Sequence, residues 1–219
     1  MMYKSLLRLF ERVKPSFDKE ILKGIFELLR YAYTERHRYY HNLTHIEACL
    51  KELEKVRSLC QSPDAVELAI IYHDVVYVPG SAVNEQASAD RASYDMDRLN
   101  LSPVLKSSVC SMIKQTCHRG IGTDGDSRIL LDIDMSILSK DKSEYIDYEN
   151  GILREYEPIV TEENLVAGRL SFLMNLIELK AIYQTQYGLD NYEAKARANI
   201  TKTIACFNKG DIGLSTWGI

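Results

Sequence analysis

Hydrophobic residues recur at helical spacing along most of the chain. In the segment 17–33, apolar side chains return every three or four positions, which is typical of an amphipathic helix. A second segment of this kind follows Asn42, whose side chain is well suited to cap a helix start. Its apolar stripe includes Ile46, Cys49, Leu50, Leu53 and Val56. We therefore expect two helices, with His45 in the first turn of the second.

Two serine-proline pairs mark further helix starts. Ser62-Pro63 precedes the segment 65–77, which is apolar nearly all round and is therefore expected to be a buried helix. The dipeptide His73-Asp74 would lie near its carboxyl end. Ser102-Pro103 gives the same signal for a helix over residues 104–117.

The remaining pattern also favours helices. Residues 128–138 are apolar enough for a helix or a buried strand, and the helical neighbours favour a helix. Loops are expected around Pro79-Gly80-Ser81 and over the Gly/Asp-rich residues 120–126, and an irregular tail is expected at 210–215. Further helices are expected over residues 84–99, 143–156, 162–187 and 191–207. Because no repeat or shift in composition divides the chain, we predict an all-α protein with one domain.

Charge and cysteine usage narrow the classes of function. The 27 basic and 31 acidic residues give a net charge of -4, so no overall positive field favours a nucleic-acid polymer, whereas a small phosphate ester is allowed. Five cysteines without a CxxC pair indicate a reducing cytoplasm. Arg8 and Glu11 interrupt any signal-peptide pattern, and no run approaches the roughly 18 apolar residues of a membrane span.

The chemically informative residues are His45, the pair His73-Asp74, and Asp134. A carboxylate in an otherwise apolar run costs several kcal/mol unless a positive charge compensates it, and a divalent cation does so directly. Imidazole nitrogen and carboxylate oxygen together suit a borderline or hard divalent metal. Taken alone, the dipeptide also fits a capped helix end, with His73 hydrogen-bonded to a carbonyl group.

Four segments together resemble a known family. They are Tyr40-His41-Asn42-Leu43-Thr44-His45, Ile71-Tyr72-His73-Asp74-Val75-Val76-Tyr77, Asn84-Glu85-Gln86-Ala87-Ser88-Ala89 and Leu131-Asp132-Ile133-Asp134-Met135-Ser136-Ile137-Leu138. They are similar to a branch of predicted metal-dependent phosphohydrolases of the HD superfamily, a helical group with a dispersed H…HD…D metal set. The likeness extends from about Arg38 to Asn199, including Gly168-Arg169 and Ala196-Arg197-Ala198-Asn199.

The resemblance implies a single HD-type helical bundle over residues 1–219. Its core would span about 38–140, and additional helices would extend it over about 141–207. The implied metal ligands are His45, His73, Asp74 and Asp134. His41 is an alternative to His45, because residues four apart share a helix face; we prefer His45 for its distance from His73-Asp74.

Asp132 is the alternative at the last ligand position. Residues two apart on a helix point about 200° from each other, so Asp132 and Asp134 cannot easily face one metal. We prefer Asp134 as the ligand. Asp132 is expected either to hold a ligand in place without binding the metal itself, or to be solvated.

Three other residues are candidates for catalysis. Glu85 follows the metal aspartate closely and could position or deprotonate water, although a glutamate also stabilises a helix start. Lys114 and His118, four apart on one helix face, suit an anionic phosphoryl group, although a surface lysine and a helix-end histidine need no such role. The basic cluster Arg36-His37-Arg38 could also contact phosphate, or it could simply be a solvated face.

The function that these residues predict is hydrolysis of a small phosphorylated substrate, a phosphomonoester or a nucleotide, by metal-activated water. The metal would be magnesium, manganese, iron, nickel, cobalt or zinc. One alternative is an HD-type di-iron oxygenase, which needs further histidines between His73-Asp74 and Asp134, where only His118 lies. A non-catalytic metal-binding module is another alternative.

Overall fold

The computed structural model describes residues 2–14, 16–117 and 120–208, and within these ranges it contains helices and no strand. The prediction of an all-α fold is confirmed. The chain divides between Asp134 and Met135 into two compact units, each described here by itself. The sequence-based division into a core up to about residue 140 and a helical extension stays a prediction.

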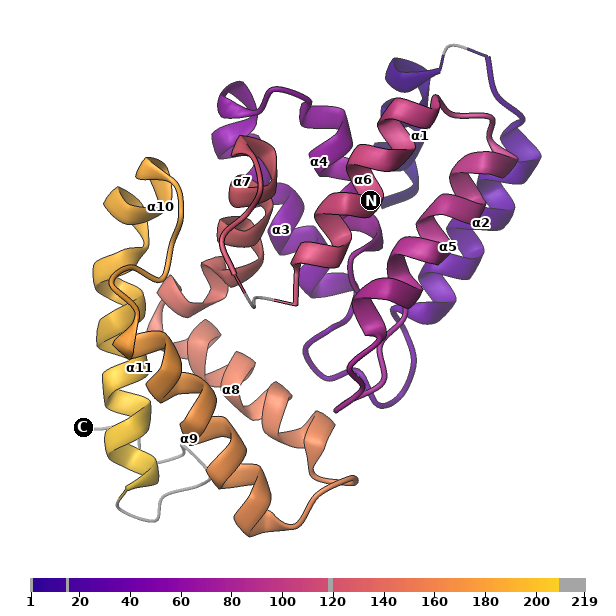
Figure 1. Ribbon diagram of the computed structural model, residues 1–219. Helices are drawn as coiled ribbons and strands as arrows, with labels where there is room; N and C mark the ends of the chain where they lie inside the picture. Colours follow the sequence, from indigo (N-terminus) through magenta and orange to yellow (C-terminus); the bar gives the residue numbers. More distant parts are fainter. Residues whose placement is uncertain (1, 15, 118–119, 209–219) are drawn as a thin grey trace. The chain divides into compact units, whose positions relative to one another are not determined.

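The first unit has seven α-helices in its described residues. They are α1 (Met2–Val13), α2 (Lys19–Ala32), α3 (Leu43–Val56), α4 (Pro63–Tyr72), α5 (Asn84–Arg98), α6 (Pro103–Gln115) and α7 (Gly125–Asp134), with the short 3-10 helix η1 (Arg57–Leu59) after α3. Helix α4 is central, and α1, α3, α5, α6 and α7 all pack against it (Figure 1). Because it is enclosed in this way, every residue from Ala65 to Tyr72 is buried.

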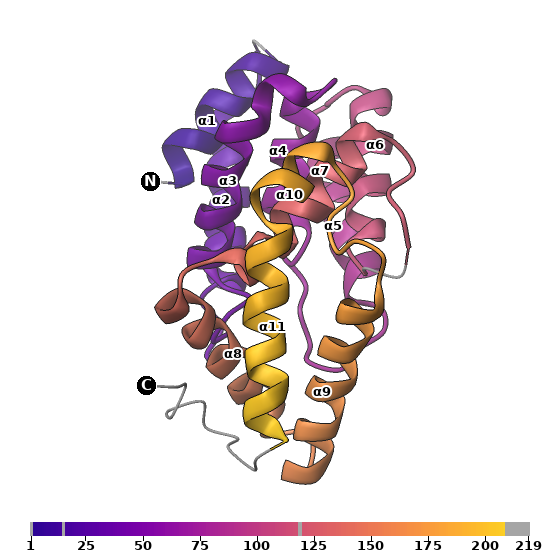
Figure 2. The same ribbon diagram turned by 90° about the vertical axis from the view of Figure 1, so that its left-hand side faces the viewer.

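The second unit contains η2 (Met135–Ser139), α8 (Lys142–Tyr156), α9 (Glu162–Glu178), α10 (Gln186–Asn191) and α11 (Glu193–Phe207). Helix α11 packs against α9, α10 and η2, and Figure 2 shows it beside α9. Buried Arg169 pairs with Glu149, with Nε to Oε2 at 2.8 Å, and Asn199 donates to the carbonyl groups of Leu138 and Lys140. The family-like elements around residues 168–169 and 196–199 therefore stabilise this unit.

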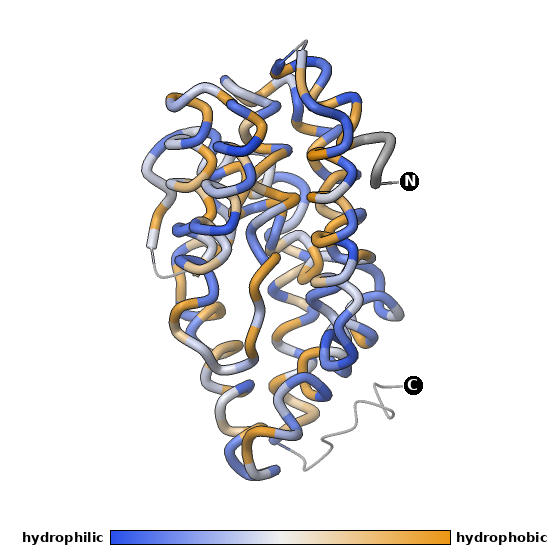
Figure 3. Tube along the Cα trace, turned by 90° about the vertical axis from the view of Figure 1, so that its right-hand side faces the viewer, coloured by the Kyte–Doolittle hydropathy of each residue, from blue (hydrophilic) through white to orange (hydrophobic). Residues whose placement is uncertain are grey.

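Hydrophobic and hydrophilic residues alternate along the helical tube in Figure 3, as the amphipathic pattern predicts. Asn42 and Ser102 cap α3 and α6, accepting hydrogen bonds from the backbone N–H groups of Thr44 and Leu105. Ser62 occupies the N-cap of α4 without a side-chain cap bond. Instead, the carboxylate of Asp126 accepts from the N–H groups of Gln61 and Ser62.

Two helix predictions need correction, and one helix was missed. The helix expected over 65–77 ends at Tyr72, because the backbone beyond it is bound by side chains from other elements. The helix expected over 162–187 is interrupted between α9 and α10, where Leu179 is extended and the carboxylate of Glu193 accepts from the N–H groups of Ile182 and Tyr183. Helix α1 was not predicted. The ambiguous segment 128–138 is helical, as α7 and η2, and the tail at 210–215 lies outside the described residues.

No helix in the described ranges is both long enough and apolar enough to cross a bilayer.

Candidate metal centre

The carboxyl end of α4 positions His73 and Asp74. His73 is the C-cap residue, and its backbone N–H donates to the carbonyl oxygen of Ala69 at 2.9 Å. The helix ends here because other groups bind its last carbonyls, which lack partners within the helix. The Nδ1 atom of His73 donates to Ile70 O at 2.8 Å, and the hydroxyl group of buried Tyr33 donates to Ile71 O at 2.8 Å.

Arg38 holds the backbone immediately beyond the helix. Its guanidinium group is buried and donates to the carbonyl oxygens of Asp74 at 2.6 Å and Val75 at 3.1 Å. It also donates to His41 O and pairs with Glu35. These contacts orient the Asp74 backbone. Because they occupy the guanidinium group of Arg38, they favour a structural role for Arg38 over phosphate binding.

Helix α5 fixes the segment that follows. The Ser88 hydroxyl group contacts both the N–H and the carbonyl group of Val76, at 3.1 and 3.2 Å. One turn earlier, Asn84 Oδ1 accepts a hydrogen bond from the backbone N–H of Val78 at 3.0 Å, and Asn84 Nδ2 donates to the carbonyl oxygen of Val78 at 2.9 Å. The segment 84–89, which resembles a family motif, therefore has a physical role: it secures the loop that follows Asp74.

Two other helices supply the remaining candidate ligands. The Asn42 cap starts α3 so that His45 lies in its first turn, and Asp134 is the last residue of α7. Both helices pack against α4 and against each other. The structure therefore brings His45, His73, Asp74 and Asp134 together from three separate elements.

The functional atoms lie very close together. The two imidazole Nε2 atoms are 3.1 Å apart. His73 Nε2 is 3.0 Å from Asp74 Oδ2 and 3.4 Å from Asp134 Oδ1, and His45 Nε2 is 3.6 Å and 3.2 Å from the same two oxygens. With metal–ligand bonds of about 2.1 Å, two ligand atoms lie about 3.0 Å apart at a right angle and about 3.4 Å apart at the tetrahedral angle. The measured separations match that range to within about 0.2 Å.

The hydrogen bond from His73 Nδ1 also fixes the role of the opposite nitrogen. Because a carbonyl oxygen only accepts, Nδ1 carries a proton, so Nε2 is the nitrogen that faces the cluster and that would offer its lone pair to a bound cation. A metal-ligating histidine is usually oriented in this way by its second nitrogen. The helix-cap interpretation and the ligand interpretation of His73 are thus compatible, since the cap aligns the ring.

The electrostatics favour a positive charge between these groups. Burial alone would lower the pKa of His73, but the carboxylates of Asp74 and Asp134 outweigh burial and hold that pKa well above its usual value. Burial alone would raise the pKa of Asp74, but attraction to His73, a hydrogen bond with it and the nearby His41 hold that pKa below its usual value. The residues present fit a divalent cation in both donor type and charge.

The cluster is closed on one side and accessible on the other. The side chains of His45 and His73 are 2% and 1% exposed, whereas those of Asp74 and Asp134 are 17% and 15% exposed. A catalytic metal site needs an accessible position for water or substrate, in contrast to a closed structural site. The carboxylate side meets this requirement.

The ligand alternatives can now be placed. His45, and not His41, belongs to the groups whose atoms could hold an ion. The His41 ring is half-buried and stacks on Tyr77, with centroids 4.1 Å apart. Asp132 is buried at 5% exposure, so the solvated alternative for Asp132 is wrong.

The catalytic candidates lie less clearly near the centre. Glu85 is half-buried in the first turn of α5, and Lys114 is exposed near the end of α6. Among the described contacts, neither reaches the four ligands, and His118 lies outside the described residues. In the basic cluster, Arg36 is exposed, and His37 Nε2 contacts Tyr77 O at 3.1 Å.

Sequence reasoning missed several residues that shape the centre. Tyr33, Asn84 and Ser88 act through hydrogen bonds between their side chains and the backbone of Ile71, Val78 and Val76, and residue spacing carries no signal for such contacts. Cys49 had a visible signal, because it lies four residues after His45 and so on the same helix face. Its place in the apolar stripe of α3 hides this signal.

Comparisons with protein-family models, with curated proteins and with solved structures find no match to this chain. The chemistry of the centre is therefore argued from its own residues. Two groups of three residues have ligand atoms within 4.8 Å of one another and could hold a metal ion: His45 with His73 and Asp74, and His45 with Cys49 and Asp134. Imidazole nitrogens and carboxylate oxygens suit a divalent metal, and the partly exposed carboxylates leave room for a further ligand.

Proposed function

We propose that this chain is a metal-dependent hydrolase of a small phosphate ester, with His45, His73, Asp74 and Asp134 as the metal ligands. One observation supports the proposal: the imidazoles of His45 and His73 lie 3.0–3.6 Å from each other and from carboxylate oxygens of Asp74 and Asp134, and these carboxylates are partly exposed. The resemblance of four sequence segments to the HD superfamily supports the same chemistry.

A divalent ion held by these residues supplies Lewis-acid polarisation of a phosphoryl oxygen and lowers the pKa of a bound water molecule. The protein residues have distinct tasks. The two buried imidazoles give neutral nitrogen donors, and Asp74 and Asp134 give two negative charges that balance a dication. Arg38, Tyr33 and the His73 cap hold the Asp74 backbone and the His73 ring in place.

Two further residues complete the proposed machinery. Glu85 positions or deprotonates the attacking water, and Lys114 contacts an anionic phosphoryl oxygen, because an ammonium group donates hydrogen bonds but cannot bind a cation. The substrate class is a phosphomonoester or a nucleotide.

The test is phosphate release from a panel of phosphomonoesters and nucleotides. Protein stripped of metal is reloaded with zinc, cobalt, manganese or magnesium, and metal content and turnover are measured on the same sample. Asp74→Ala should lose both, because it removes a donor atom and a charge. The matched control is Asp90→Ala, which changes an exposed aspartate on α5 and should leave both intact.

The outcomes separate catalysis from simple binding. Metal-dependent phosphate release that Asp74→Ala abolishes supports the proposal. Bound metal without turnover of any phosphate ester contradicts it and favours a non-catalytic metal-binding module. Full metal content in Asp74→Ala contradicts the ligand assignment itself.

A further inference from the structure

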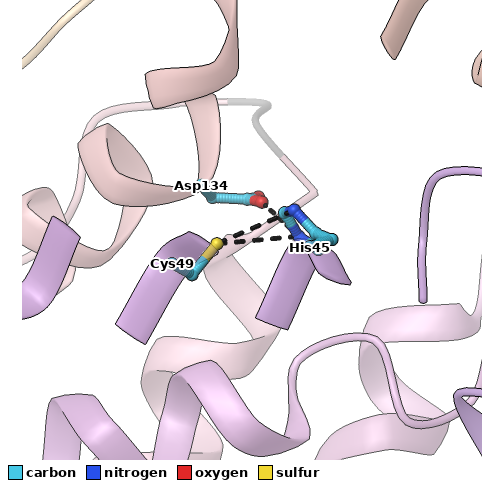
Figure 4. A group of neighbouring side chains, drawn as sticks. All are labelled: His45, Cys49 and Asp134. Carbon is cyan, nitrogen blue, oxygen red and sulfur yellow. Dashed lines mark hydrogen bonds and ion pairs between the residues drawn. The ribbon is translucent and has the colours of Figure 1, made fainter. Parts of the chain in front are cut away.

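A thiol lies beside two of the four candidate ligands, His45 and Asp134. Cys49 is one helical turn after His45 on α3, and its side chain is 3% exposed. Its Sγ atom is 3.7 Å from Nδ1 and 3.8 Å from Nε2 of His45. Figure 4 shows Cys49 and Asp134 both directed toward His45, and ligand atoms of these three residues lie within 4.8 Å of one another.

The separation suits a shared ion. With bonds of about 2.05 Å to nitrogen and about 2.3 Å to sulfur, a tetrahedral ion would place the two atoms about 3.6 Å apart. The measured distance from Sγ to His45 Nε2 is close to that value, at 3.8 Å. All five cysteines, each within the described part of the chain, carry thiols rather than disulfides, so the sulfur of Cys49 can bind a metal.

We propose that the Cys49 thiolate is an additional ligand of the metal centre and makes the centre selective for a thiophilic divalent ion. The inference rests on the metal centre of the proposed function and narrows it to Zn²⁺, Co²⁺ or Fe²⁺ over Mg²⁺ and Mn²⁺. Soft thiolate donors favour the first group, whereas the second group prefers sites built from oxygen.

Burial explains why the Cys49 thiol would lose its proton only when a metal ion binds. A thiolate enclosed in an apolar environment is costly, and a directly bound dication compensates it. Binding therefore transfers the Cys49 thiol proton to solvent as the metal–sulfur bond forms. His45, His73 and Cys49 then close the buried side of the ion, and the half-buried Asp74 and Asp134 lie toward solvent.

Co²⁺ alone is the probe for this test. Metal-free protein is titrated with Co²⁺, and two signals are recorded: bound cobalt per chain, and the near-ultraviolet charge-transfer absorption that a cobalt–thiolate bond produces. We expect one cobalt per chain with this absorption. Cys49→Ser should still bind cobalt, should lose the absorption, and should bind Co²⁺ at least about tenfold more weakly. Its affinity for Mn²⁺ should change far less.

Two controls identify the sulfur. Cys60→Ser changes a half-buried thiol at the end of η1 and should leave the absorption intact. A variant in which Cys60, Cys110, Cys117 and Cys206 are all serine keeps Cys49 as its sole cysteine and should retain the absorption. The second variant decides the question even if Cys49→Ser does not fold.

Each result supports or overturns the inference. Absorption that depends on Cys49 supports it. Stoichiometric cobalt without the absorption, or absorption that persists in Cys49→Ser, overturns the thiolate ligand and leaves the four-residue centre standing. No cobalt bound by the unchanged protein contradicts the centre itself, and the thiolate ligand with it.

Discussion

At the scale of single residues, His73 combines two tasks that are often treated as alternatives. Its Nδ1 atom donates to Ile70 O, which is the task of a residue at a helix end. Its Nε2 atom faces Asp74, Asp134 and His45 at 3.0–3.4 Å, which is the arrangement of a ligand. The first contact restricts rotation of the ring, so the second needs little further ordering when a cation binds.

Substitution of Glu85 distinguishes a catalytic role from a role in stabilising the start of α5. If Glu85 positions or deprotonates the attacking water, Glu85→Gln should lower kcat by about 100-fold or more, the usual contribution of general base catalysis. Metal content should stay unchanged, because Glu85 is not one of the ligands. If Glu85 only stabilises the start of α5, the change should cost at most about 1 kcal/mol of stability and leave kcat intact. Measuring kcat, metal content and melting temperature on one preparation distinguishes the two, and a metal-loaded, fully active variant would remove the catalytic role.

The sequence singles out Asp74 and Asp134 because each carboxylate follows an apolar run, whereas the choice of His45 comes from the family resemblance. Asp74 follows a fully apolar helix, and Asp134 follows the buried run from Ile129 to Ile133. Cys49 does not stand out from its neighbours in the sequence, because a cysteine in an apolar stripe is ordinary. Its role depends on the distance to His45, which only the packed structure gives.

At the scale of elements, the end of α4 determines where the site forms. The apolar pattern continues through Val75, Val76 and Tyr77, so local periodicity predicts a longer helix. Arg38 lies 36 residues before Asp74, and its hydrogen bond to Asp74 O replaces the bonds that a longer helix would make. A local pattern carries no information about such a contact, which is why the predicted boundary was five residues too late.

Arg38→Met tests this arrangement. The change keeps an unbranched, apolar stem but removes the donors for the carbonyl oxygens of Asp74 and Val75. It should destabilise the protein by about 1–3 kcal/mol. Metal affinity should fall by about 10–100-fold, because Arg38 supports a ligand from outside the centre. Arg36→Met, an exposed neighbour, is the control and should change neither quantity. Unchanged metal affinity in Arg38→Met would contradict the supporting role, and isothermal titration calorimetry measures it.

Asn84→Ala tests the loop that follows. Asn84 is 9% exposed and forms hydrogen bonds with both polar groups of the Val78 backbone. Losing them should cost about 1–3 kcal/mol in chemical unfolding, because buried groups are left without partners. Gln86→Ala, an exposed change on the same helix, should stay within about 0.5 kcal/mol. Equal stability of the two variants would show that the loop does not depend on Asn84.

At the scale of the whole molecule, the candidate metal centre draws its residues from α3, α4 and α7 of the first unit, so a bound ion would link these helices. A ligand that binds the folded state alone stabilises it by about 2.7 kcal/mol at a concentration 100 times its dissociation constant. Metal-free protein should therefore melt several degrees lower than metal-loaded protein. His73→Ala should show no such shift when metal is added, and a shift of equal size in that variant would place the stabilising metal elsewhere.

The interruption between α9 and α10 shows the same limit of sequence reasoning in the second unit. The Leu- and Ile-rich pattern runs through it, but Arg197 donates to the carbonyl oxygens of Ile177 and Leu179 from another helix. Periodicity predicted most of the helices and their order, because burial imposes that pattern, but it did not predict α1. Helix ends depend on partners distant in the chain.

The most direct measurement of the central claim is a crystal structure of metal-loaded protein with data collected at the absorption edge of the bound metal. We predict one anomalous-scattering peak per chain, about 2.0–2.2 Å from Nε2 of His45, Nε2 of His73 and a carboxylate oxygen of each of Asp74 and Asp134. A peak bound by His41 in place of His45 would contradict the choice within that pair. A fully metal-loaded crystal with no peak among these four residues would contradict the metal centre itself.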